Sequence, residues 1–313
     1  MGYKNNMSCL ILVFMLLFPF SLSANEDITA ASYLLVERDS FQVILGKDYH
    51  RRLPPASTTK VITSIVAIEK LDEDEGIVPD RNVLRSPRSK LNLIPGKEYR
   101  AMDLIKGAMV VSANDAAYTL ATYIGGTEAK FAPMMNEKAE EIGANDTHFK
   151  NASGLFVKGQ YTTCYDLALI FRYALLNDTF KEIVATRYFL FKDNKRSVRY
   201  KNHNRFLFCF TPAIGGKTGF TRASKHCYVG AFEKDGKVYI LSLLGSKDLW
   251  GDAIQILKNL YEQLPSDKEI RLAKASSVKL TSFKEKKEKK RLLKKKFKRH
   301  KKIKTKPVKL NEA

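Results

Sequence analysis

The sequence predicts an α+β fold in which an antiparallel sheet is flanked by helices and carries an inserted, mostly helical lobe. Two observations support this prediction. Runs rich in β-branched and aromatic residues lie near both ends of the chain, within 31–45 and 216–244. Between them, from about 100 to 185, apolar residues recur at helical spacing. The sheet is therefore expected to form from distant segments, with the helical lobe inserted between them.

The first 24 residues have the pattern of an export signal. Lys4 supplies a positive start, and 9–20 (CLILVFMLLFPF) is an apolar run that is short for a membrane span. Small residues at 21–24 offer a cleavage site, most simply after Ala24, and an uncleaved anchor is the alternative. We therefore expect a signal peptide over 1–24. The protein would then be exported, periplasmic or at the cell surface, and peripheral to the cytoplasmic membrane.

The exported part begins with a predicted hairpin and a buried helix. Residues 31–37 (ASYLLVE) and 41–45 (FQVIL) are β-rich runs joined by a short polar turn. After Pro54 and Pro55, apolar residues recur at helical spacing through 57–71. The prolines give this predicted helix a sharp entry and place Ser57 in its first turn.

The remaining elements fall into a helical group followed by a strand-rich group. Helices are predicted over 103–111, 116–124, 131–142 and 166–176. Antiparallel strands are predicted over 216–221, 227–233 and 238–244, and a closing amphipathic helix over 250–264. We expect one domain over 25–265 and a separate basic tail over 266–313.

Three short motifs occur in order along this domain. They are Ser57-Thr58-Thr59-Lys60, Ser112-Ala113-Asn114 and Lys217-Thr218-Gly219. Singly each is weak, because SxxK recurs at 276–279 and SxN at 23–25. The three together, in this order and in these predicted elements, indicate a nucleophilic serine site.

The first two motifs suit nucleophilic catalysis. A serine hydroxyl needs a base to take its proton, and Lys60 lies one helical turn from Ser57. A lysine acts as a base only if burial or a neighbouring cation lowers its pKa, and Lys217 is the candidate neighbour. Ser112 is expected to relay the proton to the leaving amine, and Asn114 to hold the substrate amide.

The third motif suits an exposed strand edge that binds an extended peptide. Gly219 allows close approach of the substrate backbone, while Lys217 and Thr218 offer a cation and a hydroxyl to its terminal carboxylate. The backbone N–H groups of Ser57 and Phe220 are expected to form the oxyanion hole. No metal-ligand spacing is present. His203 precedes the third motif and is interpreted as a surface residue, with an approach to the substrate carboxylate as the alternative.

These motifs resemble the signature of penicillin-binding proteins and β-lactamases. The chain looks like the low-molecular-mass penicillin-binding proteins, the serine D-alanyl-D-alanine carboxypeptidases, from about Ala31 to Leu264. The similarity includes PPASTTK (54–60), IPGKEY (94–99), VVSANDAA (110–117), THFKNASGL (147–155), YTTCYDLALIFRYAL (161–175) and GGKTGFT (215–221).

The resemblance implies a β-lactamase-like fold and a Ser57 acyl-enzyme. It also implies action on D-Ala-D-Ala ends of peptidoglycan stem peptides, acylation by β-lactams, and no metal or organic cofactor. Two departures stand out: 222–226 (RASKH) replaces the more usual Ala-Gly turn, and about fifty residues after Leu264 are too few for both a β-rich C-terminal domain and an anchor.

Two other functions remain open at this point. A secreted β-lactamase shares the nucleophile and the fold, but the deacylation motif ExxLN is absent between Ser112 and Lys217. A penicillin-binding sensor or scaffold would be acylated with little turnover, and the intact motifs argue against it. Turnover of a D-Ala-D-Ala peptide separates all three.

The C-terminal segment is strongly basic. The whole chain has a formal net charge of +21, and 284–309 holds 16 lysine or arginine residues and two glutamates. Nucleic acid is an improbable partner for an exported protein. We expect attachment to anionic lipid headgroups, with a solvated tail that binds nothing specific as the alternative.

Overall fold

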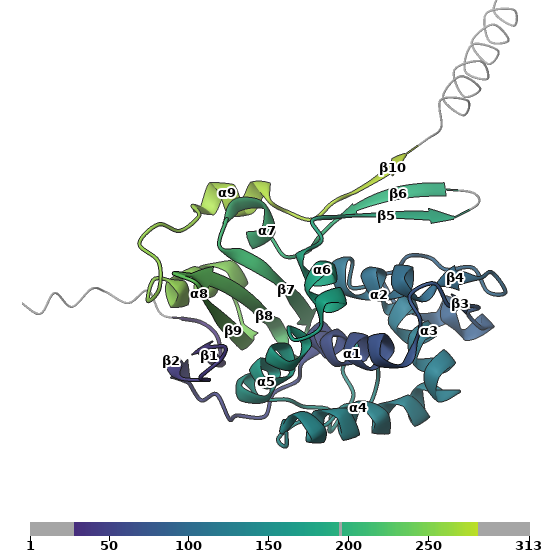
Figure 1. The fold of residues 1–313 in the computed structure, drawn as a ribbon, viewed down its shortest axis with the longest axis horizontal. Helices are drawn as coiled ribbons and strands as arrows, with labels where there is room; N and C mark the ends of the chain where they lie inside the picture. The colour runs from purple at the N-terminus through teal and green to yellow at the C-terminus, as the bar shows by residue number, and fades with distance from the viewer. Residues whose placement is uncertain (1–27, 194–195, 281–313) are drawn as a thin grey trace, which may run out of the picture.

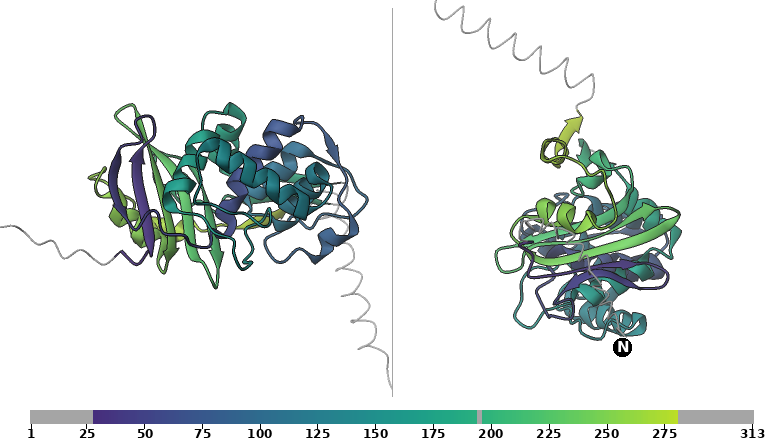
Figure 2. Two further views of the ribbon diagram at one scale, coloured as in Figure 1. Left: turned by 90° about the horizontal axis from the view of Figure 1, so that it is seen from below. Right: turned by 90° about the vertical axis from the view of Figure 1, so that its left-hand side faces the viewer.

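A five-stranded antiparallel sheet lies at one end of the molecule and a lobe of helices at the other (Figures 1 and 2). The computed structural model describes residues 28–193 and 196–280. The sheet order is β2-β1-β9-β8-β7, with β1 (Ser32–Glu37), β2 (Val43–Lys47), β7 (Ala213–Thr221), β8 (Lys225–Lys234) and β9 (Lys237–Ser246). The strands therefore come from both ends of the domain, which confirms the predicted α+β arrangement.

The inner strands β1, β8 and β9 are mostly buried, and their successive side chains point to opposite faces, each of which is covered by a core. In β1, Leu34 and Val36 belong to the core shared with the helical lobe, whereas Tyr33 and Leu35 belong to the core on the other face. Helix α5 (Cys164–Ala174) packs on the lobe side and α8 (Leu249–Leu257) on the opposite side.

The helical lobe is built around α1 (Lys60–Lys70), which follows the short 3₁₀ helix η1 (Ala56–Thr59). Residues 60–67 of α1 are all buried, because neighbouring helices surround that part of it. These neighbours are α2 (Ala101–Val110), α3 (Asn114–Gly125), α4 (Glu128–Ile142), α5 and α6 (Asp178–Ala185). A lysine at the first position of α1 is thus placed inside the protein.

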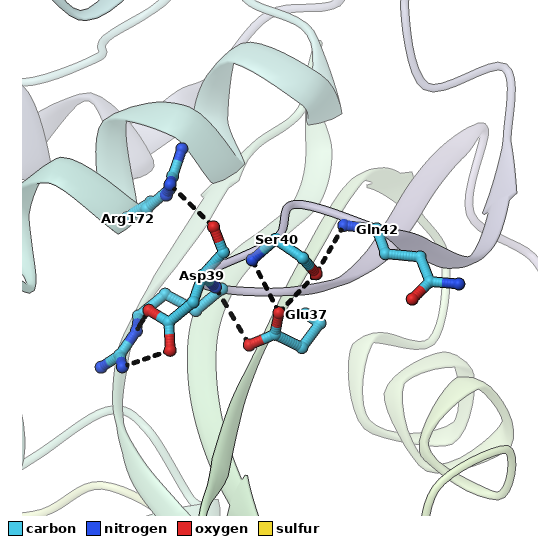
Figure 3. A network of polar contacts seen from close by, with 6 residues as sticks. Glu37, Asp39, Ser40, Gln42 and Arg172 are labelled. Atoms are coloured by element: carbon cyan, nitrogen blue, oxygen red, sulfur yellow. Dashed lines mark hydrogen bonds and ion pairs between the residues drawn. The ribbon is translucent and has the colours of Figure 1, made fainter.

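The turn between β1 and β2 is tied to the helical lobe by polar contacts (Figure 3). The Glu37 carboxylate accepts backbone N–H bonds from Asp39 at 3.0 Å and Ser40 at 2.7 Å. Arg172 of α5 donates to the Asp39 carbonyl at 3.0 Å. The contacts from Ser40 and Asp39 lower the pKa of Glu37, so this turn is held by a charged acceptor.

Several elements were not predicted from the sequence. A two-stranded ribbon joins β3 (Gly76–Ile77) to β4 (Tyr99–Arg100), with the 3₁₀ helix η2 (Arg81–Arg85) between them. A three-stranded sheet, in the order β10-β6-β5, projects beside the helical lobe (Figure 1). It consists of β5 (Tyr188–Asp193), β6 (Arg196–Lys201) and β10 (Ser277–Leu280).

The described structure continues past the boundary expected near residue 265. Helix α7 (Phe206–Cys209) contacts α9 (Asp267–Leu272), whose Ile270 is buried, and β10 pairs antiparallel with β6. Helix α8 also ends at Leu257 rather than near Leu264, because the chain turns where Asn259 donates to the Ile256 carbonyl. The predicted signal segment 1–24 and the basic run 284–309 lie outside the described residues.

Candidate active site

The three sequence motifs meet at one cleft between the sheet and the helical lobe. Ser57 lies in η1, Lys60 begins α1, Ser112 and Asn114 occupy the α2–α3 corner, and Lys217, Thr218 and Gly219 lie on β7. Ser57, Ser112, Thr218, Gly219 and Phe220 line a hollow of about 370 Å³. Segments more than one hundred residues apart therefore supply a single site.

The Ser57 and Lys60 side chains are in contact, as their spacing predicted. The Lys60 Nζ lies 3.0 Å from Ser57 Oγ and also donates to Asn114 Oδ1 at 2.8 Å and to the Ser153 carbonyl at 2.7 Å. The pKa of Lys60 is well below its ordinary value, first because the side chain is fully buried and second because of the Lys217 charge. A neutral amine within hydrogen-bond reach can accept the serine proton.

Two carboxylates act on Lys60 in the opposite direction. Asp115 and Glu128 both favour its charged form. Asp115 is buried and accepts backbone N–H bonds from Leu91 at 2.9 Å and Leu93 at 3.1 Å, so the loop before α2 holds this carboxylate in place. Desolvation and Lys217 outweigh both carboxylates.

The corner between α2 and α3 fixes Ser112 and Asn114. Ser112 has a positive φ of 60°, in the left-handed region that usually favours glycine after a helix. The backbone N–H groups of Val111 and Ala113 both donate to the Gly107 carbonyl, at 3.2 Å and 3.0 Å, which closes the helix end. A non-glycine residue in this conformation has a strained backbone, and such strain is often found at functional sites.

Asn114 joins two parts of the site. Its Oδ1 accepts from Lys60, and its Nδ2 donates to the Arg88 carbonyl at 2.7 Å. Its backbone N–H donates to the Ser89 carbonyl at 2.7 Å. Asn114 therefore orients the base and fixes the 88–89 loop against the cleft, in addition to the substrate-binding role expected of it.

Lys217 lies on β7 with its ammonium directed at the Ser112 hydroxyl. The Nζ–Oγ distance is 3.0 Å, and the same nitrogen donates to the Thr218 carbonyl at 2.7 Å. Lys217 is buried, and this burial lowers its pKa to about 7. The side chain can therefore carry a positive charge near neutral pH when an anion is bound beside it.

Gly219 brings β7 against the start of η1. A Cβ at this position would lie 2.8 Å from the Ser57 backbone nitrogen and 2.9 Å from Ala56 Cβ. β7 is the edge strand of the five-stranded sheet, so its outer side has no strand partner in that sheet. Phe220, the next residue, is exposed and packs on His226 with ring centroids 4.6 Å apart, beside the turn where this chain departs from the usual Ala-Gly sequence.

Sequence reasoning assigned no role to the segment 151–154, which contacts both Ser57 and Lys60. The Ser153 carbonyl accepts from both Lys60 and Ser57, the latter at 3.4 Å. Asn151 Oδ1 accepts from the Gly154 backbone N–H at 2.8 Å, and Glu128 Oε1 accepts from that of Ala152 at 3.0 Å. The string THFKNASGL was the only available signal, because these contacts join residues far apart in the sequence.

His203 is half-buried at the cleft, which favours the alternative interpretation over that of a surface residue. His203 follows β6 and lines the cleft with Ser57 and Ser112. Its pKa is lowered to about 4, mainly by burial and then by the charges of Lys217 and Lys60. A neutral imidazole therefore stands where sequence reasoning favoured a solvated one.

The remaining candidate groups give no second site of the same kind. Within residues 28–193 and 196–280, no group of three or more His, Cys, Asp or Glu side chains could hold a metal ion. Cys164, Cys209 and Cys227 are unpaired thiols, and burial raises the pKa of each. None of the helices in these ranges is long and apolar enough to span a membrane.

The chain matches a protein family along most of its length. A family model described as D-alanyl-D-alanine carboxypeptidase matches residues 20–248. D-alanyl-D-alanine carboxypeptidase DacB2 of Mycobacterium tuberculosis is 36% identical over 220 residues, which cover 70% of this chain and 75% of that protein. DacF of Bacillus subtilis is 31% identical over 223 residues, covering 69% of this chain and 57% of that protein. The chain thus spans little more than half of DacF.

Solved structures show the same architecture. A D-alanyl-D-alanine carboxypeptidase from Mycobacterium tuberculosis H37Rv superposes with a TM-score of 0.71 and 32% identity, covering 77% of this chain and 95% of that one. A variant of the Streptomyces K15 DD-transpeptidase gives a TM-score of 0.69 and 27% identity, covering 74% and 98%. The predicted β-lactamase-like fold of the DD-peptidases is therefore confirmed.

Proposed function

Because the chain belongs to the D-alanyl-D-alanine carboxypeptidase family of penicillin-binding serine hydrolases, we propose that it removes the terminal D-alanine from peptidoglycan stem pentapeptides through an acyl-enzyme on Ser57. The observation that carries the proposal is the pair of lysine–serine contacts in one cleft. Lys60 reaches Ser57 and Lys217 reaches Ser112, each at 3.0 Å.

The proposed reaction has two steps. Ser57 Oγ attacks the carbonyl between the two D-alanines while neutral Lys60 takes its proton. The C–N bond then breaks, and the proton taken by Lys60 is relayed through Ser112 to the departing amine, so that Lys60 is again neutral and Ser112 keeps its hydroxyl. Water hydrolyses the Ser57 ester in the second step, which releases the shortened peptide and restores the hydroxyl.

Binding of the substrate is assigned to β7 and the start of η1. Lys217 and Thr218 hold the terminal carboxylate, and Gly219 lets the peptide backbone lie against the open edge of the strand. The backbone N–H groups of Ser57 and Phe220 stabilise the oxyanion. Asn114 holds the substrate amide. β-Lactams are proposed to acylate Ser57 at the same place, and no metal or organic cofactor takes part.

The cellular location is part of the same proposal. The signal-like segment 1–24 directs export to the periplasm or cell surface, and the basic segment within 266–313 binds anionic lipid headgroups, at about 1 kcal/mol for each basic residue near the surface. Removing residues 284–313 should then shift the protein from the membrane to the soluble fraction. Unchanged fractionation would refute the membrane contact without bearing on catalysis.

The test of function is the mass of a pentapeptide substrate after incubation with the purified protein. Loss of one alanine is expected, with water as the acceptor. A β-lactamase would instead hydrolyse penicillin rapidly and leave the pentapeptide intact. A sensor would be labelled by penicillin with little turnover of either compound, and both results would contradict the proposal.

A further inference from the structure

A second hollow adjoins the catalytic cleft and is lined by cationic side chains. It has a volume of about 440 Å³ and shares Ser89, His203 and Ala275 with the catalytic cleft. Its walls carry Arg88, Lys90 and Lys201, together with polar and apolar residues. No aspartate or glutamate lies among its lining residues, so the charge on its walls is of one sign.

These cations have no carboxylate partner within the described part of the chain. None of the three takes part in an ion pair there. Lys90 Nζ donates to the Ser86 carbonyl at 3.1 Å, and Lys201 Nζ donates to the Leu272 carbonyl at 3.4 Å. An ammonium has three N–H donors, so each lysine retains capacity for an anionic ligand.

The position of the hollow relates it to one end of the substrate. Val111 lines it, and the next residue, Ser112, contacts Lys217, which is assigned to the terminal carboxylate. His203 lines both hollows, and the charge of Lys217 contributes to lowering its pKa. Ser57, Gly219 and Phe220 line the catalytic cleft but not the second hollow. It therefore extends from the carboxylate end of the site, on the side of the leaving amino acid.

We propose that Arg88, Lys90 and Lys201 form an anion subsite for a second carboxylate on the leaving group. The inference rests on the proposed function and extends it to the leaving side of the scissile bond. The α-carboxylate of the leaving D-amino acid binds at Lys217 and Thr218, while its acidic side chain reaches past His203 into the anion subsite. The substrate class is thus peptides ending in D-alanyl–(acidic D-amino acid), beside D-alanyl-D-alanine.

The chemistry of this cleavage is that of the main reaction. Ser57 Oγ forms an ester with the D-alanyl carbonyl, the C–N bond to the acidic amino acid breaks, and the serine proton leaves with the new amine. Water then hydrolyses the ester. No additional reactant is required, because only the bound leaving group differs.

The test uses three peptides with the same acyl portion, ending in D-Ala-D-Ala, D-Ala-D-Glu or D-Ala-D-Gln. D-Gln is the neutral isostere of D-Glu, so the ratio of their kcat/KM values reports charge alone. We expect this ratio to exceed one and to fall as ionic strength rises, since salt screens partly exposed charges. The variant Arg88→Gln/Lys90→Gln should lower the ratio by about 2- to 5-fold for each charge removed, mainly through KM.

Lys237→Gln provides the matched control, because Lys237 is an exposed lysine at the start of β9 and lines neither hollow. Its D-Glu/D-Gln ratio should equal that of the wild type. Equal rates for D-Glu and D-Gln in the wild type, with normal turnover of D-Ala-D-Ala, would overturn the anion subsite alone. An unchanged ratio in the double variant would also overturn it. Absence of turnover with all three peptides would overturn the proposed function as well.

Discussion

Lys60 and Lys217 are buried in the same site, and neither takes part in an ion pair within residues 28–193 and 196–280. The roles proposed for them require opposite protonation states. Lys60 must be neutral to accept the Ser57 proton, whereas Lys217 must be charged to hold a carboxylate. Desolvation lowers the pKa of both, and the Lys217 charge lowers that of Lys60 further. The site therefore works in a pH window set by two amines.

This arrangement predicts a bell-shaped pH profile for kcat/KM. Activity should rise with pH as Lys60 loses its proton and fall as Lys217 loses its own, with both limbs below the ordinary lysine value of 10.5. A bound carboxylate raises the pKa of Lys217, so the alkaline limb of kcat should lie at higher pH than that of kcat/KM. Steady-state kinetics on a D-Ala-D-Ala peptide across pH 5–11 measures both. A profile that stays flat across this range would contradict the assignment of the lysines.

Contacts between residues close together in the sequence could be predicted. Ser57 and Lys60 are one turn apart, so their contact follows from helical geometry. The contact of Lys60 with the Ser153 carbonyl spans 93 positions and involves a backbone atom, which carries no residue-type signal. The position of His203 was left open for a related reason, since a lone histidine does not reveal which elements will surround it.

At the scale of elements, the turn 151–154 depends on a glycine that permits close contact with η1. Gly154 has φ +77°, and a Cβ there would lie 1.8 Å from the Ala56 carbonyl oxygen. The neighbouring Ser153 carbonyl is an acceptor for both Ser57 and Lys60. Displacement of this turn would therefore remove one of the groups that orients the nucleophile and its base.

Gly154→Ala should slow acylation by at least about tenfold and lower the free energy of unfolding by about 1–3 kcal/mol. Stopped-flow labelling with a fluorescent penicillin and thermal unfolding would measure the two effects. Gly143→Ala is the control, because Gly143 has φ +88° at the end of α4 but nothing lies within 4 Å of an added Cβ. It should share the backbone strain without slowing acylation. Equal acylation rates in both variants would show that the turn does not position the site.

The elements that were predicted have regular patterns of apolar residues. Helix α1 and strands β8 and β9 contain long runs of buried residues. The bounds predicted for each of them agree with the structure to within a few residues. Strand β6 has mostly half-buried, polar side chains (RSVRYK), so its sequence lacks that pattern. It pairs with the neighbouring β5 and with the distant β10, and β10 lies in a segment expected to be a tail.

In the whole molecule, the cleft exists only where the two lobes meet, and the last described elements complete it. Lys274 and Ala275, between α9 and β10, line the catalytic cleft beside Arg205. Ile270 is buried in the core that includes α8, and Ala273 is buried as well. The segment 266–280 thus contributes both to packing and to the wall of the site.

Two truncations distinguish this segment from the basic run. Ending the chain after residue 283 should leave the melting temperature and the activity on soluble peptide unchanged. Ending it after 265 also removes α9 and β10. The lost apolar burial should lower the free energy of unfolding by roughly 2–3 kcal/mol and the melting temperature by roughly 5–10 °C. Differential scanning calorimetry measures the difference. Equal melting temperatures would show that 266–280 adds nothing to the domain.

The central claim is that Ser57 carries the acyl group, and the most direct measurement is mass spectrometry of the protein after reaction with a penicillin. We expect one covalent adduct on the proteolytic peptide that contains Ser57. In Ser57→Ala, both this adduct and turnover of the pentapeptide should be absent, while the melting temperature stays close to that of the wild type because the hydroxyl is only partly buried. An adduct on another residue, or labelling that survives in Ser57→Ala, would contradict the account.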